Sequence, residues 1–174
     1  SSLAYVCAVK GYRFRVVSSD AFAAEKLKTM QAFGAELTIV PSDGGKVTPE
    51  LIPAMVAQAA EFAAEPGAYW TDQLNNADSL VGYRGVGSEL IEQMDRPIDV
   101  FCAMVGTAGL AMGVSAAFAD AGAATRFVIL EPASTAVISG GDPGTHSVEG
   151  TGIGFVPPLL DRERYDEVRP IDEA

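Results

Sequence analysis

Metal-binding and disulfide chemistry have few residues available in this sequence. The 174 residues include one histidine, His146, and two cysteines, Cys7 and Cys102. A single histidine excludes a multi-histidine metal site, and a mixed zinc site needs clustered ligands, which these are not. We therefore expect Cys7 and Cys102 to be reduced core residues rather than a disulfide framework. We expect His146, which lies in a loop, to be solvated and to have no catalytic role.

Positive charge and long apolar runs are also scarce. There are 12 Lys and Arg residues against 23 Asp and Glu residues, which gives a formal net charge of -11. Such a surface repels phosphate backbones and anionic lipid headgroups, and charged residues interrupt every apolar stretch well before the roughly 20 residues that span a bilayer. We therefore expect neither nucleic acid nor a membrane as a partner. Reduced cysteines, and a start without a basic signal-peptide region, predict a cytoplasmic protein.

Strand and helix patterns alternate along the chain. The sequence predicts strands over 13–17, 36–40, 69–71, 98–105, 126–130 and 168–171, and helices over 3–10, 24–33, 49–62, 78–94 and 110–121. Thr48 is expected to cap the third helix, with Pro49 as its first helical residue. The apolar run 98–105 is typical of a strand buried on both faces. This order predicts an α/β fold, a parallel sheet with helices on both faces in three layers.

A glycine loop follows the 98–105 run directly. Gly106, Thr107, Ala108 and Gly109 separate this strand from the helix that begins near Leu110. Glycine lets backbone N–H groups approach a ligand closely, and a helix start presents unpaired N–H groups, so a phosphate is the natural ligand. The loop has neither the Walker A sequence nor G-x-G-x-x-G. A tight turn in which glycine only avoids strain is the alternative that the spacing leaves open.

Two further segments are candidates for binding. Gly150, Gly152 and Gly154 alternate over five residues, which suggests either backbone lying beneath a planar group or a flexible hairpin. In the segment 72–76, Gln73 follows a predicted strand and could bind a carboxylate through its amide. The alternative for Gln73 is a polar cap on the next helix.

In sequence order, these motifs resemble those of the cysteine synthase and cystathionine β-synthase group of pyridoxal-phosphate enzymes. The segment 72–76 looks like the family's "DQFxN", and 82–90 is similar to "HYxTTGPEI". The segment 105–113 resembles the cofactor-phosphate loop "VGTGGTxxG", and 150–157 resembles "GIGxGFxP". Glu25–Leu37 and Glu131–Pro132 also match family motifs, so the resemblance covers essentially the whole chain.

The resemblance implies a fold-type II enzyme related to the tryptophan synthase β-subunit, with pyridoxal 5′-phosphate between two α/β domains. Residues 1–70 would belong to the small domain and 71–174 to the larger one. The activity implied is replacement of the leaving group on an activated serine by a thiol or sulfide, which makes cysteine or a related amino acid, in a possible homodimer. The cofactor-binding residues implied are Gly106, Thr107, Ala108, Gly109, Leu110, Gly150 and Gly152, with Gln73 on the substrate carboxylate.

Departures from the family pattern limit these expectations. Ala108 replaces a glycine, and Leu110 replaces a threonine that would give its hydroxyl to the phosphate. The family's Schiff-base lysine would precede Ser1, so we expect an incomplete, internal segment with no catalytic residue that is inactive alone. The alternatives are a non-catalytic Rossmann-like domain that binds a phosphate or nucleotide, and a pseudoenzyme whose altered loop serves an interaction.

Overall fold

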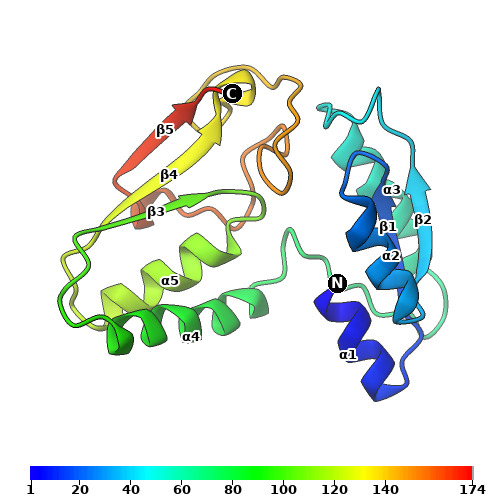
Figure 1. Cartoon of the computed structure of the whole chain (residues 1–174), viewed down its shortest axis with the longest axis horizontal. Helices are drawn as coiled ribbons and strands as arrows, with labels where there is room; N and C mark the ends of the chain where they lie inside the picture. The colour runs from blue at the N-terminus through cyan, green and yellow to red at the C-terminus, as the bar shows by residue number, and fades with distance from the viewer. Residues whose placement is uncertain (174) are drawn as a thin grey trace. The chain divides into compact units, whose positions relative to one another are not determined.

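Parallel strands form two separate sheets in the computed structural model of the chain, which describes residues 1–173 (Figure 1). One sheet pairs β1 with β2, and the other has the order β3-β4-β5. The chain divides into two compact units, Ser1–Trp70 and Thr71–Ala174, which we call unit 1 and unit 2. Every strand pair in both sheets is parallel, which confirms the predicted α/β class.

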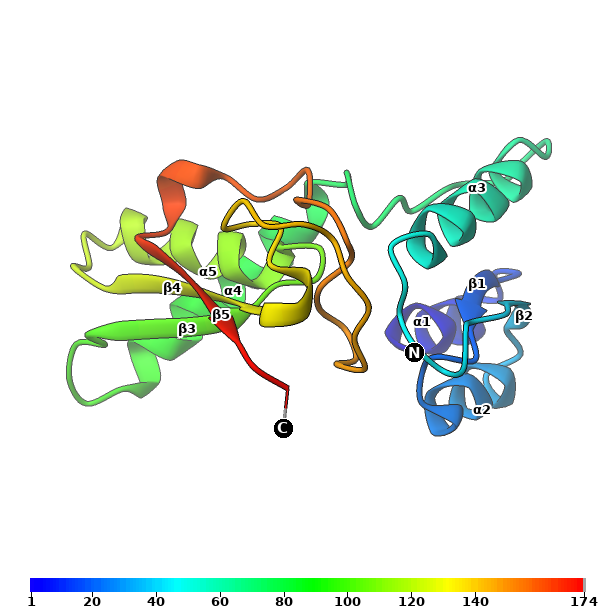
Figure 2. The same ribbon diagram turned by 90° about the horizontal axis from the view of Figure 1, so that it is seen from above.

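Unit 1 is a two-stranded sheet with helices on both faces. Its elements are α1 (Ser2–Lys10), β1 (Arg15–Ser19), α2 (Ala24–Ala32), β2 (Glu36–Val40) and α3 (Leu51–Ala63). Helices α2 and α3 lie on opposite faces of the strand pair (Figures 1 and 2). A small core of Ala4, Met30 and Ala35 holds α1 and α2 to the sheet. Gly11 ends α1 in the left-handed conformation, which glycine adopts without strain because it has no Cβ atom.

Two predicted features of unit 1 are wrong. Helix α3 begins at Leu51 rather than at Pro49, because the Leu51 N–H bonds to the Thr48 carbonyl at 3.2 Å and closes a turn before the helix. Proline presets φ equally well for the second position of such a turn. Residues 69–71 form no strand, and Tyr69 is 79% exposed. Aromatic residues favour strands only where a neighbouring strand pairs with them, and none does here.

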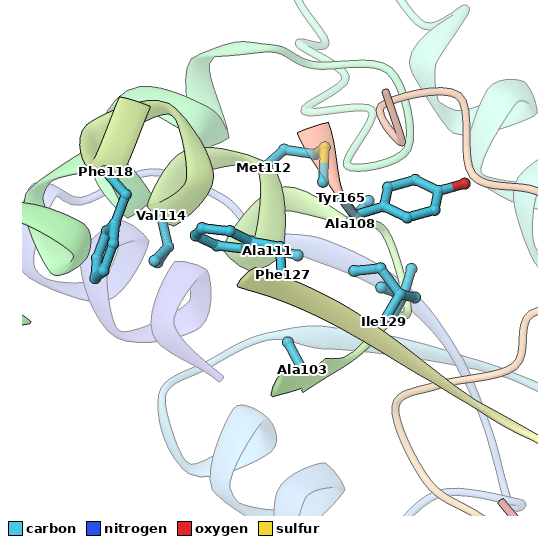
Figure 3. Close-up of a cluster of buried hydrophobic side chains, with 10 residues drawn as sticks. Ala103, Ala108, Ala111, Met112, Val114, Phe118, Phe127, Ile129 and Tyr165 are labelled. Atoms are coloured by element: carbon cyan, nitrogen blue, oxygen red, sulfur yellow. The ribbon is translucent and has the colours of Figure 1, made fainter. Parts of the chain in front are cut away.

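Unit 2 places two helices together on one side of its sheet (Figure 1). Its elements are α4 (Asp78–Gln93), β3 (Val100–Met104), α5 (Gly109–Asp120), β4 (Arg126–Pro132), η1 (Ala133–Thr135), η2 (Arg162–Arg164) and β5 (Glu167–Ile171). The core lies between α5 and the sheet, where Phe118 of α5 packs edge-on against Phe127 of β4 with 5.7 Å between ring centroids (Figure 3). Phe101 of β3 stacks obliquely on the same ring.

Strand β3 is buried on one face and lies at the edge of the described sheet. Ala103 is 8% exposed, whereas Val100 is 48% and Met104 is 43% exposed. Helix α5 covers only the face that carries Phe101 and Ala103, and alternate residues of a strand point to opposite faces. The predictions of burial on both faces and of a core position for Cys102 are therefore wrong: Cys102 is exposed, and Cys7 in α1 is half-buried.

Glycine residues let α4 and α5 approach closely. A Cβ atom on Gly87 of α4 would lie 2.6 Å from the Ala117 Cβ and 3.1 Å from the backbone of Val114. On the facing helix, a Cβ atom on Gly113 would lie 2.4 Å from the Tyr83 Cβ. Real Cβ atoms essentially never approach another atom as closely as 2.6 or 2.4 Å, so the helix pair depends on both glycines. The contact fixes the middle of α4 against α5.

Replacing Gly87 by Ala tests this close contact. Alanine is normally the better helix former, but here its methyl group meets backbone atoms of α5 that cannot move aside. We expect Gly87→Ala to lower the free energy of unfolding by about 2 kcal/mol. Gly85→Ala is the matched control in the same helix, with nothing within 4 Å of the new methyl group, and should raise stability by about 0.5–1 kcal/mol. Urea unfolding measures the free energy of unfolding of both variants. An equal change in the two would contradict the close contact at Gly87.

An ion pair at the start of β2 makes the stability of unit 1 depend on pH. Arg13 donates two hydrogen bonds to the Glu36 carboxylate, at 2.6 and 2.7 Å, which lowers the pKa of Glu36. The ion pair therefore stabilises the folded state fully when the pH is above the unfolded-state pKa of about 4.3. This stabilisation is lost as the pH falls through the lower folded-state pKa. Glu36→Gln should therefore melt below the wild type at pH 7, and this difference should close as the pH falls through the lowered folded-state pKa of Glu36. A constant difference across this range would contradict the linkage.

Candidate functional site: the glycine loop at the start of helix α5

Four consecutive backbone donors lie in the turn after β3 and at the first two residues of α5. The N–H groups of Thr107, Ala108, Gly109 and Leu110 donate no hydrogen bond within residues 1–173, and the first bond of the helix comes from the Met112 N–H to the Ala108 carbonyl at 3.0 Å. Such N–H groups carry the positive end of the helix dipole. The predicted strand–loop–helix order is confirmed here, and its geometry suits an anion. The loop supplies no cationic side chain of its own.

The family's missing glycine falls at the strained position of the loop. Ala108 is the N-cap of α5 and has φ +69° and ψ −5°, the left-handed conformation that favours glycine. This conformation costs a residue with a Cβ roughly 1–2 kcal/mol. Ala108 is only 4% exposed and belongs to the unit 2 core, and burial of its methyl group offsets about 0.8 kcal/mol of that cost. The loop therefore keeps a glycine-like turn although alanine occupies it.

The second glycine segment lies against the end of β3. The Thr151 hydroxyl donates to the Val105 carbonyl at 2.8 Å, and the Gly152 N–H donates to the same oxygen at 3.3 Å. A Cβ atom on Gly106 would lie 2.4 Å from the Gly150 carbonyl oxygen. The structure thus brings Gly150 and Gly152 to Gly106. They lie in a turn and the loop after it, not in a hairpin.

Glycine in these loops is needed for contact between protein segments. Gly106 makes room for Gly150, and a Cβ atom on Gly109 would lie 3.0 Å from the Tyr83 ring and 3.3 Å from the Ser79 hydroxyl of α4. Gly150 and Gly152 have φ +82° and +60°, values that side-chain-bearing residues rarely adopt. The glycines thus permit a tight turn, and the same turn leaves the four N–H groups unpaired. Phosphate binding by the loop stays a prediction.

The prediction that His146 is solvated is wrong. His146 is 2% exposed, and its ring Nε2 lies 2.6 Å from the Gly152 carbonyl oxygen. The sequence offered no periodic pattern around His146 from which burial could be predicted. Thr151 was also missed, although a hydroxyl residue between two glycines is a signal that could have identified it.

A buried carboxylate orders the turn that follows β4. Glu131 is 1% exposed and accepts hydrogen bonds from the Ile138 N–H at 2.8 Å, the Ser139 N–H at 2.9 Å and the Ser139 hydroxyl at 2.6 Å. A buried charged group needs such donors to replace water. Glu131 therefore holds the beginning of the long segment that returns to the glycine loop at Thr151.

Gln73 lies exposed on a turn of residues 72–75 that leads into α4. The alternative of a helix cap is wrong, because the N-cap position of α4 is Ala77 and no side chain caps it. Within the same stretch, the Ser79 hydroxyl donates to the Asn76 carbonyl at 3.0 Å, and Ser79 lies beside Gly109 together with Tyr83. The segment that carries Gln73 therefore enters α4 beside the loop. Carboxylate binding by Gln73 stays a prediction.

Two other kinds of feature are absent from the part of the chain that the structure describes. Within residues 1–173, no three His, Cys, Asp or Glu side chains are grouped so that they could hold a metal ion. Over the same residues, no helix combines the length and apolar character needed to cross a membrane.

Replacing Gly106 by Ala tests the contact between the two loops. The new methyl group would meet the Gly150 carbonyl oxygen, a backbone atom held by the neighbouring Thr151 bond. We expect Gly106→Ala to lower the free energy of unfolding by about 2 kcal/mol. Gly82→Ala on α4, where nothing lies within 4 Å, is the control and should not destabilise. Unchanged urea unfolding of Gly106→Ala would show that the 150–152 segment moves freely.

Known proteins share this sequence and fold over nearly the whole chain. The family model "Pyridoxal-phosphate dependent enzyme" matches residues 1–172. The chain is 34% identical to a cysteine synthase of Staphylococcus aureus over 168 residues, 95% of this chain and 52% of the relative. It is 31% identical to a probable cysteine synthase of Bacillus subtilis, over 98% of this chain and 55% of the relative.

A solved structure gives the same result for the fold. The crystal structure of cysteine synthase from Entamoeba histolytica matches with a TM-score of 0.85 and 29% identity, over 98% of this chain and 49% of that one. The chain therefore spans about half the length of the relatives that it matches, and these are fold-type II enzymes of the cysteine synthase kind. On the family match over residues 1–172, the chain belongs to the family of pyridoxal-phosphate dependent enzymes.

Proposed function

We propose that this chain is a segment of a cytoplasmic, pyridoxal-phosphate dependent enzyme that makes cysteine or a related amino acid from an activated serine and a thiol or sulfide. The observation that carries this proposal is the set of four unpaired N–H groups at the start of α5, in a chain of this family. The proposed role of the loop 106–110 is to bind the phosphate of the cofactor.

The residues of the loop fit a phosphate group. Backbone donors of Thr107 to Leu110 are free of partners in the described chain, and so is the Thr107 hydroxyl. A helix start stabilises negative charge through its dipole. When bound, the cofactor supplies an electron sink for the reaction at the substrate's α-carbon. The loop's own contribution is to hold the phosphate and so to orient the cofactor.

The remaining predicted residues have subsidiary roles in this proposal. Gly150 and Gly152, which lie against the end of β3, would line the cofactor face. The Gln73 amide would bind the carboxylate of a small amino-acid substrate. Unit 1 would be part of the small domain and unit 2 part of the larger domain of a homodimeric enzyme.

We also propose that these 174 residues do not catalyse the reaction by themselves. The lysines of the chain are Lys10, Lys26, Lys28 and Lys46, all in unit 1 and all exposed, and unit 2 contains none. The family's reaction needs a lysine amine to hold the cofactor and move the substrate's α-proton. The glycine loop therefore has no such amine within its own unit.

Exchanging Leu110 tests the phosphate site by gain of function. Leu110 is 39% exposed in the first turn of α5. Leu110→Thr adds a hydroxyl donor, and Leu110→Val is its matched control, with the same shape and no hydroxyl. A hydrogen bond to a charged group contributes roughly 1.5–3 kcal/mol, so we expect Leu110→Thr to bind pyridoxal 5′-phosphate about tenfold more tightly than Leu110→Val. Calorimetric titration measures this, with pyridoxal, which lacks the phosphate, as the control ligand.

The outcomes of that titration separate the proposals. Equal binding of pyridoxal and pyridoxal 5′-phosphate, or equal binding by the two variants, would contradict a phosphate site in this loop. Tight binding of nucleotides in preference to pyridoxal 5′-phosphate would instead support a nucleotide-binding domain.

Turnover by the 174-residue chain is the test of the proposed inactivity. We expect no cysteine when the purified chain is incubated with pyridoxal 5′-phosphate, O-acetylserine and sulfide, measured by ninhydrin or mass spectrometry. Steady formation of cysteine, abolished by replacing one of the four lysines, would overturn this expectation.

A further inference from the structure

His146 is held in one tautomer by two backbone groups. The Val148 N–H donates to Nδ1 at 3.2 Å, so Nδ1 carries no proton in this arrangement. Nε2 therefore carries the ring proton of the neutral side chain and donates it to the Gly152 carbonyl at 2.6 Å. At 2% exposure, neither bond competes freely with water.

The imidazole ring also fills the space that the missing side chain of Gly152 leaves. A Cβ atom at Gly152 would lie 2.6 Å from Nε2 of His146 and 2.8 Å from Cγ2 of Thr135. His146 thus contacts Gly152 both through its hydrogen bond and through van der Waals packing of the ring. Because glycine has no Cβ atom, the backbone of Gly152 could adopt many conformations. Contact with the ring favours the one observed, with φ +60°.

From Gly152 the contacts continue to the glycine loop. Gly152 and Thr151 both donate to the Val105 carbonyl, and Val105 immediately precedes Gly106. The carbonyl of Gly150 in turn lies in the space that Gly106 leaves free. His146 therefore contacts Gly152, and Gly152 is hydrogen-bonded to Val105 in the backbone that precedes the four unpaired N–H groups.

We propose that His146 is a positioning residue for the anion site: it fixes Gly152, and through Thr151 and Val105 it fixes the orientation of the N–H groups of Thr107 to Leu110. It acts through the backbone and does not touch the anion, because both ring nitrogens are occupied. This role rests on the proposed phosphate site for its use, but the ordering of the loop by His146 holds whether or not phosphate binds.

Three variants remove separate parts of this arrangement. His146→Leu removes both ring bonds and keeps an apolar side chain in the buried site. His146→Gln keeps an N–H donor at the reach of Nε2 and should restore part of the effect. Thr151→Val removes only the hydroxyl donated to the Val105 carbonyl. The matched control is Thr125→Val, which removes an equivalent bond at the other end of the same strand segment, from the Thr125 hydroxyl to the Ile98 carbonyl at 2.7 Å.

Backbone ¹⁵N relaxation of the 174-residue chain, without ligand, measures the ordering directly. We expect the order parameters of the Thr107 to Leu110 amides to fall from about 0.85 toward about 0.6 in His146→Leu and Thr151→Val, and less in His146→Gln. Thr125→Val should lose stability without changing these amides. Unchanged order parameters in both His146→Leu and Thr151→Val, or a loop already mobile in the wild type, would overturn the proposal.

Binding of inorganic phosphate and of pyridoxal 5′-phosphate adds the functional readout. In His146→Leu we expect both to bind about tenfold more weakly, the loss that an unpaired buried carbonyl would bring, and in Thr125→Val binding should be unchanged. If the wild type binds neither, the proposed phosphate site fails while the relaxation data still decide the role of His146. If the wild type binds and His146→Leu binds equally well with an ordered loop, the positioning role fails and the phosphate site stands.

Discussion

The Val105 carbonyl oxygen is the point on which the candidate site depends. It lies at the end of β3, where a parallel strand has no further partner in its ladder, and it accepts two hydrogen bonds from Thr151 and Gly152. These bonds hold a segment 46 residues further along the chain against the beginning of the glycine loop. Glu131 holds the beginning of the connection between β4 and β5, and the two bonds to Val105 hold Thr151 and Gly152 beside Gly106.

The second constraint on the candidate site is the need for glycine, because its backbone segments lie in close contact. Gly87 and Gly113 bring α4 onto α5, Gly109 brings the start of α5 under Tyr83, and Gly106 receives the Gly150 carbonyl. Each of these approaches excludes a side chain at one position and places backbone polar groups near the loop. The proposed anion site would therefore be a consequence of packing: the turn is tight enough to leave its N–H groups without partners among the described residues.

Local patterns predicted the elements but not their exposure. The order β3, Gly106–Gly109, α5 could be predicted because an apolar run, glycines and a helical pattern are local features, and so could the left-handed end of α1 at Gly11. The burial of His146 could not, since it depends on Gly152 and Thr135, which only the folded chain brings to the ring. The exposure of Cys102 and Met104 could not be predicted either, because an apolar run gives no information on which face of a strand a helix covers. The predicted strand at 69–71 was wrong because a strand needs a pairing partner, and the local sequence does not show whether one is present.

An anion held by backbone N–H groups and no cationic side chain, on a chain with a net charge of -11, should respond to salt in an unusual direction. The loop 106–110 and the segment 150–154 contain no lysine or arginine whose attraction salt could screen. What salt does screen is the long-range repulsion between the acidic surface and an approaching dianion, which extends over roughly 10 Å at 0.1 M ionic strength. Moderate concentrations of a weakly binding salt should then speed the association of a phosphate compound with this loop, where a lysine-based phosphate site would be slowed.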